Sequence, residues 1–267
     1  MVNTIKLNTG ASVKDYNKVS DWLSFETPDK IFISSGKVDI GQHISTTLAL
    51  ISSRELEVDI NVITVKKLNT DVTPNEGITA SSLSVPNSGT AIRSASIIFK
   101  KSFLGYASKS LNINKNCLKL DNGVVKDPNS NASISYWDFS KTDEFLKLTI
   151  PENIEIFEQT NIDYDLHVET KFINSIVKGE YKFLHDLKFD DMLHARIIRP
   201  PSYSHKFLSI DDKVNKYLND HNLELYIKNS FIAVLGVDEY EVIKSLNLLK
   251  NSIKWGQINK LANDKIF

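Results

Sequence analysis

Two short segments, both rich in hydroxyl and amide groups, contain the residue types in this chain that best suit the binding of an anion. The first segment is Gly36–Thr46, which includes Gly41 and Gln42, and the second is Thr73–Ser84. Each lies between a strand-like pattern and a helix-like pattern, so each is expected to present backbone N–H groups at the start of a helix. Such groups suit a phosphate or an oxo-anion.

The side chains of the two segments add donors and acceptors to these backbone groups. Gln42 offers both kinds of group from a tight turn, which could orient an oxo ligand or the edge of a heterocycle. Hydroxyl groups of the second segment suit a phosphate or pyrophosphate, and they belong to Thr79, Ser81, Ser82 and Ser84. The alternative is that both segments are ordinary strand–helix turns with capping side chains.

Composition limits the classes of protein to which the chain could belong. It has 267 residues, of which 41% are hydrophobic and 24% charged, as is usual for one large or two medium globular domains. The net charge of −1 gives no basic field for nucleic acid or for an anionic membrane. We expect a cytoplasmic protein, because no window is long and apolar enough for a membrane span and the first residues lack an apolar leader.

Other catalytic chemistries have little support in the sequence. The single cysteine, Cys117, cannot hold a four-cysteine iron–sulfur cluster, and its apolar neighbours predict a buried, unreactive thiol. No histidine pair has the spacing of a zinc site on a helix, so surface or hydrogen-bonded histidines are expected. No G-x-S-x-G elbow or P-loop occurs. Hydrolase interpretations therefore fall away.

Periodic patterns predict the elements that position the two segments. Residues 30–35 form a strand ending at Gly36, a helix follows over 38–56, a second strand covers 61–65, and a long helix covers 87–109. Before them, about twenty polar residues predict an irregular arm. Four apolar residues of the long helix are spaced to form its core stripe: Ala91, Ala95, Ile98 and Leu104.

The rest of the chain predicts a hairpin over 117–125, extended chain over 133–137, and a connecting region over 143–174. The last third alternates short strands and helices, which is typical of an α+β module. Its predicted elements are paired strands at 179–184 and 192–199, a strand at 207–210, a helix at 211–219, strands at 223–227 and 231–235, and a helix at 238–251.

Several segments, taken together and in order, resemble a known family. Residues 36–42 (GKVDIGQ), 71–84 (DVTPNEGITASSLS), 87–93 (NSGTAIR), 183–187 (FLHDL) and 192–202 (MLHARIIRPPS) are similar to motifs of molybdopterin-binding large subunits. These proteins belong to the xanthine dehydrogenase/aldehyde oxidase superfamily, and the isoquinoline 1-oxidoreductase and nicotinate dehydrogenase type is the most similar. Motifs in matching order over nearly the whole chain are far more specific than one loop.

The resemblance implies roles for particular residues. Gln42, the one catalytic candidate, would lie beside the molybdenum oxo group, and Ile40 and Gly41 would follow the pterin. The second segment would bind pterin and phosphate. Its implied cofactor-binding residues are Thr79, Ala80, Ser81, Ser82 and Ser84. No residue of this chain is implied as a metal ligand.

Two residues depart from the family pattern, and one part of the pattern is missing. His43 and Ser81 stand where the family has glycine, which allows a closer backbone approach. The later G-G-G-F-G loop and the G-E-P-G segment with the carboxylate base do not occur. We therefore expect the front part of a large subunit, either truncated or split, which is not expected to be active alone.

The expected fold class is α/β (α+β), with residues 1–165 forming part of a molybdopterin-binding domain, 166–256 an α/β hammerhead domain, and 257–267 a tail. The implied function is hydroxylation of an aldehyde or N-heteroaromatic compound with water as the oxygen source. The implied cofactor is molybdenum–molybdopterin in its cytosine dinucleotide form. Implied partners are a small subunit carrying iron–sulfur clusters, the remainder of the large subunit and a small-molecule substrate.

Two rival functions remain open at this point. One is a non-catalytic paralogue or assembly module that holds the iron–sulfur subunit, which the missing base and the two departures favour. The other is a phosphate-binding α/β protein unrelated to molybdenum. Molybdenum in the purified complex, and a partner sequence with the missing carboxylate, would distinguish the enzyme from both rivals.

Overall fold

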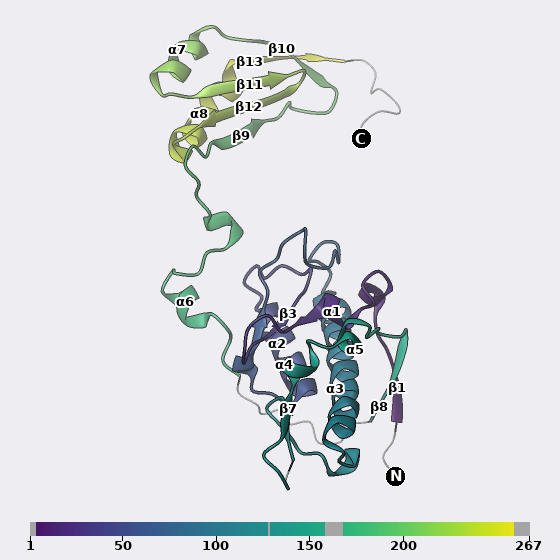
Figure 1. Cartoon of the computed structure of the whole chain (residues 1–267). Helices are drawn as coiled ribbons and strands as arrows, with labels where there is room; N and C mark the ends of the chain where they lie inside the picture. The colour runs from purple at the N-terminus through teal and green to yellow at the C-terminus, as the bar shows by residue number, and fades with distance from the viewer. Residues whose placement is uncertain (1–3, 128, 158–167, 259–267) are drawn as a thin grey trace. The chain divides into compact units, whose positions relative to one another are not determined.

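The computed structural model describes residues 4–127, 129–157 and 168–258. The chain forms two compact units, Met1–Tyr181 and Lys182–Phe267, and both mix helices with small sheets (Figure 1). The predicted boundary between residues 165 and 166, and most of the predicted tail, lie outside the described residues. None of the described helices is long and apolar enough to cross a bilayer.

The first unit is built around two helices, α2 (Ile44–Leu56) and α3 (Thr90–Leu111), which pack against each other beside a small sheet (Figure 1). This sheet has the order β2 (Leu23–Ser24), β3 (Ile31–Ile33) and β4 (Ile63–Val65), and β3 and β4 are parallel. The first candidate segment leaves β3 and enters α2. The second follows β4 and enters α3, so each segment connects a strand to a helix.

Helix α3 owes its central position to small and aromatic residues at intervals of four. Ala91, Ala95, Phe99, Phe103 and Ala107 are all fully buried and form one stripe along the helix. The predicted stripe was right for the two alanines, whereas Ile98 and Leu104 are only partly buried against the same core. The helix ends where Asn112 adopts a left-handed conformation, with φ of 53°.

An aromatic cluster fills the space between α3 and the two short helices α4 (Tyr136–Phe139) and α5 (Asp143–Leu146). The ring of Phe99 lies 5.0 Å from that of Tyr136 and 5.5 Å from that of Phe139, centroid to centroid. The hydroxyl group of Tyr136 donates a hydrogen bond of 2.8 Å to the Leu56 carbonyl at the end of α2. This contact anchors α2 to the aromatic cluster.

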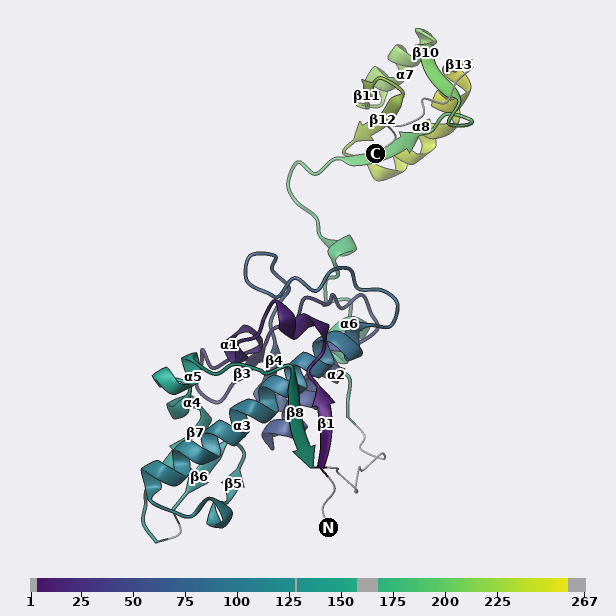
Figure 2. The ribbon, with the colours of Figure 1, turned by 90° about the vertical axis from the view of Figure 1, so that its right-hand side faces the viewer.

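Two further pairings complete the first unit. Strands β1 (Thr4–Asn8) and β8 (Asn153–Phe157) are antiparallel and lie side by side (Figure 2), so the predicted irregular arm and connecting region both contain a strand. The predicted hairpin is part of a three-stranded sheet of β5 (Leu120–Asp121), β6 (Val124–Lys126) and β7 (Ser133–Ser135). Its first residues form a 3₁₀ turn, in which Cys117 is exposed, so the prediction of a buried thiol was wrong.

The first unit also contains two shorter α-helices, α1 (Val19–Trp22) and α6 (Ile173–Val177). The second unit contains a sheet of order β11 (Glu224–Lys228), β12 (Phe231–Gly236) and β9 (His194–Ile198), all antiparallel. A separate antiparallel pair consists of β10 (His205–Ile210) and β13 (Ile253–Gln257). Residues 179–184 form no strand, and β9 pairs with β12, so the predicted pairing of 179–184 with 192–199 was wrong.

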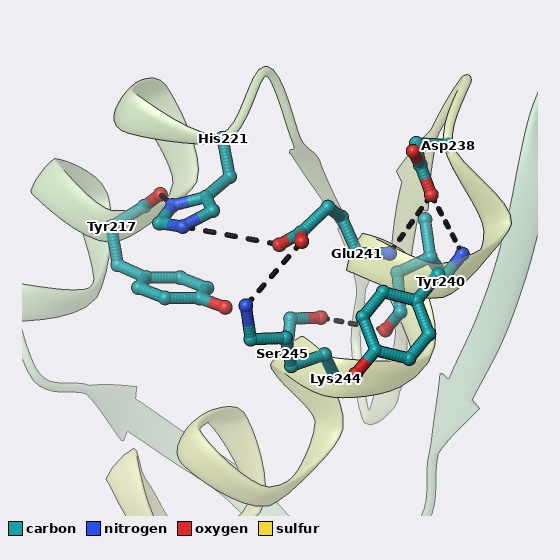
Figure 3. A network of polar contacts seen from close by, with 8 residues as sticks. Tyr217, His221, Asp238, Tyr240, Glu241, Lys244 and Ser245 are labelled. Atoms are coloured by element: carbon teal, nitrogen blue, oxygen red, sulfur yellow. Dashed lines mark hydrogen bonds and ion pairs between the residues drawn. The ribbon is translucent and has the colours of Figure 1, made fainter.

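Helices α7 (Lys213–Asp220) and α8 (Glu239–Ser252) supply the core of the second unit together with the sheet. A polar network joins them (Figure 3). The Tyr217 and His221 rings stack at 4.1 Å, His221 Nε2 lies 3.9 Å from Glu241 Oε2, and Lys244 Nζ lies 3.4 Å from Glu241 Oε1. That this unit is a hammerhead domain stays a prediction.

Candidate cofactor-binding loops

The structure places the two candidate segments side by side. The backbone N–H of Val38 donates to Thr79 Oγ1 at 2.8 Å. The side chain of Lys37, only 6% exposed, donates from Nζ to the carbonyls of Glu76 at 2.7 Å and Ile78 at 3.1 Å. We call residues 36–43 the first loop and residues 73–84 the second loop. These three hydrogen bonds and a fourth, from the Gly36 N–H to Glu76 Oε2, join the two loops.

Gly36 allows the two loops to approach closely. A Cβ atom built on Gly36 would lie 2.0 Å from the Pro74 carbonyl oxygen and 2.9 Å from the Glu76 nitrogen. No side chain fits at such distances, so glycine is required by the close backbone contact and not by its backbone angles. The contact places the start of the first loop directly against the start of the second.

The carboxylate of Glu76 ties the loops to the elements beneath them. Its Oε2 accepts from the Gly36 N–H at 2.8 Å and from the hydroxyl of Ser88, and its Oε1 accepts from Ser12 Oγ at 2.7 Å. Ser35 Oγ lies 3.4 Å from Oε2. Hydrogen bonds to an ionised acceptor are stronger than neutral ones, so Glu76 is the main organiser of this region.

Gln42 folds its side-chain amide back onto its own turn. Its Oε1 accepts from the Ile40 N–H at 2.7 Å, and its Nε2 donates to the Val38 carbonyl at 2.8 Å. The turn needs a positive φ at Gly41, where it is 103°, and again at His43, where it is 61°. An amide NH₂ group has two donors, so Gln42 keeps one N–H for a ligand without releasing the turn.

The Asp39 carboxylate accepts hydrogen bonds from the backbone N–H groups at the start of α2. Its Oδ1 accepts from the N–H groups of Gly41 at 3.1 Å and His43 at 3.3 Å, and its Oδ2 accepts from Ser45 at 3.2 Å. These are the amides that sequence reasoning assigned to an anion. The carboxylate stabilises the helix start through the helix dipole, and it supplies the negative charge itself.

The second loop contains a tight turn with left-handed residues. Ser81 and Ser82 have φ values of 56° and 57°, and the Leu83 N–H donates to the Ala80 carbonyl at 3.2 Å, which is the pattern of a type I′ turn. Both positions at which glycine was expected, His43 and Ser81, thus have the backbone conformation that favours glycine.

The same turn presents free hydrogen-bonding groups. Ser81 and Ser82 are exposed, and neither their hydroxyls and N–H groups nor the hydroxyl of Ser84 has a partner among the described residues. A π-helical turn, Val85–Gly89, begins directly after Ser84 and continues into α3, so the dipole of a long helix starts here. No described carboxylate forms an ion pair with Lys37, whose ammonium group contacts this loop. The hydroxyls, the amides and these positive potentials suit an anion.

The segment that begins at residue 168 contacts the start of α2 and strand β4. The Lys171 N–H donates to Thr46 Oγ1 at 2.8 Å, and Lys171 Nζ donates to the Ile63 carbonyl at 2.9 Å. Burial, together with the nearby Asp39 carboxylate, raises the pKa of Tyr181. Within the described ranges, no group of three or more His, Cys, Asp or Glu side chains could hold a metal ion.

Sequence reasoning identified the two loops and Thr79, but not the other side chains that hold the loops together. Ile40, Gly41 and Gln42 form one turn, and Thr79, Ala80, Ser81, Ser82 and Ser84 form the other. Lys37, Asp39 and Glu76 were given no role. A signal for Asp39 was available, because an aspartate shortly before a helix often accepts from its first amides. The partners of Glu76 are distant in sequence, so no local pattern could indicate them.

A comparison with known protein families identifies the family to which this chain belongs. Residues 2–171, which include both loops, match the model of the molybdopterin cofactor-binding domain. The chain belongs to this family. The prediction of a molybdopterin-binding subunit of the xanthine dehydrogenase/aldehyde oxidase superfamily is thereby confirmed.

Individual proteins that are similar in sequence to this chain are consistent with this family assignment. The chain is 25% identical over 236 residues to a nicotinate dehydrogenase subunit of Pseudomonas putida, a match that covers 84% of this chain and 19% of that protein. It is 27% identical over 97 residues to aldehyde oxidase 3 of Rattus norvegicus, covering 36% of this chain and 7% of the relative. The chain thus spans about a fifth or less of the length of these relatives.

Solved structures superpose on part of the chain. CO dehydrogenase from Oligotropha carboxidovorans gives a TM-score of 0.36 at 21% identity, covering 48% of this chain and 16% of that one. Quinoline 2-oxidoreductase from Pseudomonas putida 86 gives a TM-score of 0.33 at 16% identity, covering 48% of this chain and 17% of that one.

Proposed function

We propose that the two loops form one part of the molybdopterin site in the large subunit of a molybdenum hydroxylase. The observation that carries this proposal is the direct connection of the loops through Val38 and Thr79, at 2.8 Å. It places a turn with a free amide N–H beside a turn with free hydroxyls and backbone amides. A ligand that contains both a pterin and a phosphate needs both kinds of group close enough together to contact it at the same time.

The second loop is proposed to bind the phosphate and the adjoining pterin. Ser81 and Ser82 supply unpaired N–H groups, and Ser84 supplies a hydroxyl at the start of the helical run into α3. The ammonium of Lys37 lies beneath the loop and adds positive potential. Thr79 has a different role, because its hydroxyl already accepts from Val38.

Gln42 is proposed to donate its second amide N–H to an oxygen at the metal end of the cofactor, while Ile40 and Gly41 follow the pterin edge. The two hydrogen bonds that Gln42 makes within its own turn hold the amide in place before the ligand arrives. When bound, the cofactor supplies a two-electron oxidation of an electron-poor carbon, with water as the oxygen source. The substrate class is an aldehyde or an N-heteroaromatic compound.

The rest of the catalytic apparatus belongs to other polypeptide segments. The chain covers 19% of the nicotinate dehydrogenase subunit that it resembles, and it contains one cysteine. We therefore propose that the remainder of the large subunit supplies the carboxylate base and that a small subunit carries the iron–sulfur clusters. The cofactor is proposed to be the cytosine dinucleotide form.

The test is the cofactor content of the complex that contains this chain. The complex, purified through a tag on the chain, is analysed for molybdenum by mass spectrometry and for the nucleotide released by acid hydrolysis. We expect near-stoichiometric molybdenum and cytidine monophosphate. A fully assembled complex that contains no molybdenum would contradict the proposal and would favour the assembly module or the unrelated phosphate-binding protein.

Variants then test whether residues of the two loops bind the cofactor. Ser82→Ala and Gln42→Ala are expected to lower molybdenum per chain or, for Gln42→Ala, turnover. Matched controls are Ser110→Ala at the end of α3 and Gln257→Ala in β13, which remove the same groups from exposed positions outside the loops. Unchanged metal content and rate in the loop variants would exclude these residues from the site.

A further inference from the structure

The second unit presents an unpaired strand edge at β11. In the sheet order β11-β12-β9, β11 pairs with β12 on one side only. No hydrogen bond from a described residue reaches the other edge of Glu224–Lys228. Tyr226 is 50% exposed and Ile227 39%, although their side chains point to opposite faces of the sheet. An exposed edge of this kind is a template for pairing with another strand.

The sheet face next to this edge is uncovered by the helices, and it carries exposed apolar side chains between the charged Glu224 and Lys228. Helices α7 and α8 pack with Ile232 and Val234 on the other face. On the open face the register aligns Tyr226 with Ala233 and Ile197, and Ile197 is 49% exposed. Phe231, at the end of β12, is 47% exposed and lies edge to face with Tyr226, with ring centroids 6.1 Å apart. The open face therefore continues to the β11 edge.

The sequence of β11 is complementary to itself when it is read in reverse. The strand is Glu-Leu-Tyr-Ile-Lys, with an acid and a base at equal distances from the central Tyr226. If two copies pair antiparallel about Tyr226, Glu224 of each copy faces Lys228 of the other, and Leu225 faces Ile227. Opposite charges and apolar pairs at directly facing positions stabilise antiparallel strands. Neither charged side chain has an ion-pair partner among the described residues.

The other edge of the same sheet lacks this property. Strand β9 is centred on Arg196, so the same antiparallel pairing of two β9 strands would place two arginines opposite each other. Facing like charges destabilise a strand pair. Arg196 is in addition engaged with Glu239 of α8. Charge complementarity therefore selects β11 as the edge that accepts a second copy.

We propose that this chain self-associates through β11. Two copies pair their β11 strands antiparallel about Tyr226 and form a continuous six-stranded sheet with a two-fold axis at its centre. The contact is one short strand and two exposed ion pairs, so the dimer is weak and sensitive to salt. The proposal concerns the second unit alone and does not depend on the cofactor assignment.

Sedimentation velocity of the full chain over a hundredfold range of concentration tests this pairing. Wild-type protein is expected to shift from monomer to dimer. Glu224→Lys and Lys228→Glu each place like charges at both facing positions, so each variant alone is expected to dissociate at least about tenfold more readily. An equimolar mixture of these two variants restores an acid opposite a base at both positions. It is expected to dimerise, as is the double variant Glu224→Lys/Lys228→Glu.

A control variant and a measurement of folding accompany this experiment. Lys254→Glu reverses a charge on β13, away from the β11 edge, and is expected to dimerise like wild type. Circular dichroism of every variant excludes unfolding as the cause of a lost dimer. A wild-type chain that stays monomeric at all concentrations would overturn the proposal. So would single variants that dimerise as readily as wild type, or a mixture that fails to recover.

Discussion

The hydroxyl of Thr79 accepts a hydrogen bond of 2.8 Å from the backbone N–H of Val38, a residue 41 positions earlier in the chain. Thr79→Val keeps the shape of the side chain and removes the acceptor. We expect a loss of about 1–2 kcal/mol in the free energy of unfolding, because the N–H is left unpaired. Molybdenum per chain in the complex is expected to fall as the loops lose their alignment. Thr79→Ser retains the hydroxyl and is expected to retain both properties; equal behaviour of the valine and serine variants would refute this role.

Glu76 is expected to contribute more than any other side chain to the joint position of the loops. Glu76→Gln keeps the size but replaces one acceptor oxygen by a donor that faces the Gly36 N–H or the hydroxyls of Ser12 and Ser88. A decrease of about 2 kcal/mol in unfolding free energy, measured with urea, is expected. Glu57→Gln is the control, because the ion pair that Glu57 forms with Lys100 is exposed, and its loss is expected to cost less than about 1 kcal/mol. A Glu76 variant as stable as this control would contradict the assignment.

The close contact at Gly36 predicts a steric effect. Gly36→Ala places a methyl group 2.0 Å from the Pro74 carbonyl oxygen, so the backbone of one loop must move. Thermal unfolding is expected to show a loss of about 3 kcal/mol. Gly105→Ala is the matched substitution, because the space around Gly105 in α3 is open. That change is expected to stabilise the chain by about 1 kcal/mol. Tolerance of alanine at Gly36 would show that the loops are less tightly joined.

The positive φ values in the two turns predict that glycine will be stabilising there. At φ of 56° for Ser81 and 61° for His43, a side chain is strained by about 1–2 kcal/mol, and glycine loses part of that gain through its greater freedom when unfolded. We expect Ser81→Gly and His43→Gly each to raise the unfolding free energy by about 0.5–1 kcal/mol. Ser84→Gly, at φ of −62°, is expected to lower it. The same sign at all three positions would disprove the explanation.

The buried hydroxyl of Tyr136 predicts a loss of stability at high pH. Burial, with a smaller contribution from the Glu57 carboxylate, raises the pKa of Tyr136 well above its ordinary value. Above a pH of about 10 the unfolded chain releases this proton while the folded chain keeps it, so the free energy of unfolding falls as pH rises. Tyr136→Phe is expected to flatten this decline. It is also expected to cost about 1–2 kcal/mol at neutral pH, because the Leu56 carbonyl loses its donor. In the exposed control Tyr203→Phe, neither effect is expected.

Local patterns predicted those elements whose structure depends on neighbouring residues. The strand at 30–35 and the helices at 211–219 and 238–251 were placed within a few residues of β3, α7 and α8. The helix predicted from residue 38 begins only at Ile44, because Gly41 and His43 adopt positive φ and form a turn first. Apolar spacing alone does not detect such a turn.

Pairings between distant segments could not be predicted in this way. The polar residues of β1 predict an irregular arm, because its partner β8 lies about 150 residues later and no local pattern indicates the pairing. The residues proposed to contact a ligand were selected by type and order, whereas Lys37 and Glu76, which join the loops, were not. Glu76 is an ordinary loop glutamate by sequence, and only the folded chain brings Ser12, Gly36 and Ser88 to it.

Asp39 makes the two loops electrically unlike. Its carboxylate already accepts from the amides at the start of α2, whereas the carboxylate of the second loop, Glu76, accepts from Gly36, Ser12 and Ser88 and leaves the N–H groups of Ser81 and Ser82 without an acceptor among the described residues. An elongated ligand with one anionic end therefore finds unpaired amides at the second loop and amides already occupied by Asp39 at the first. The polypeptide thus dictates which way round such a molecule lies before any contact with its rings is made.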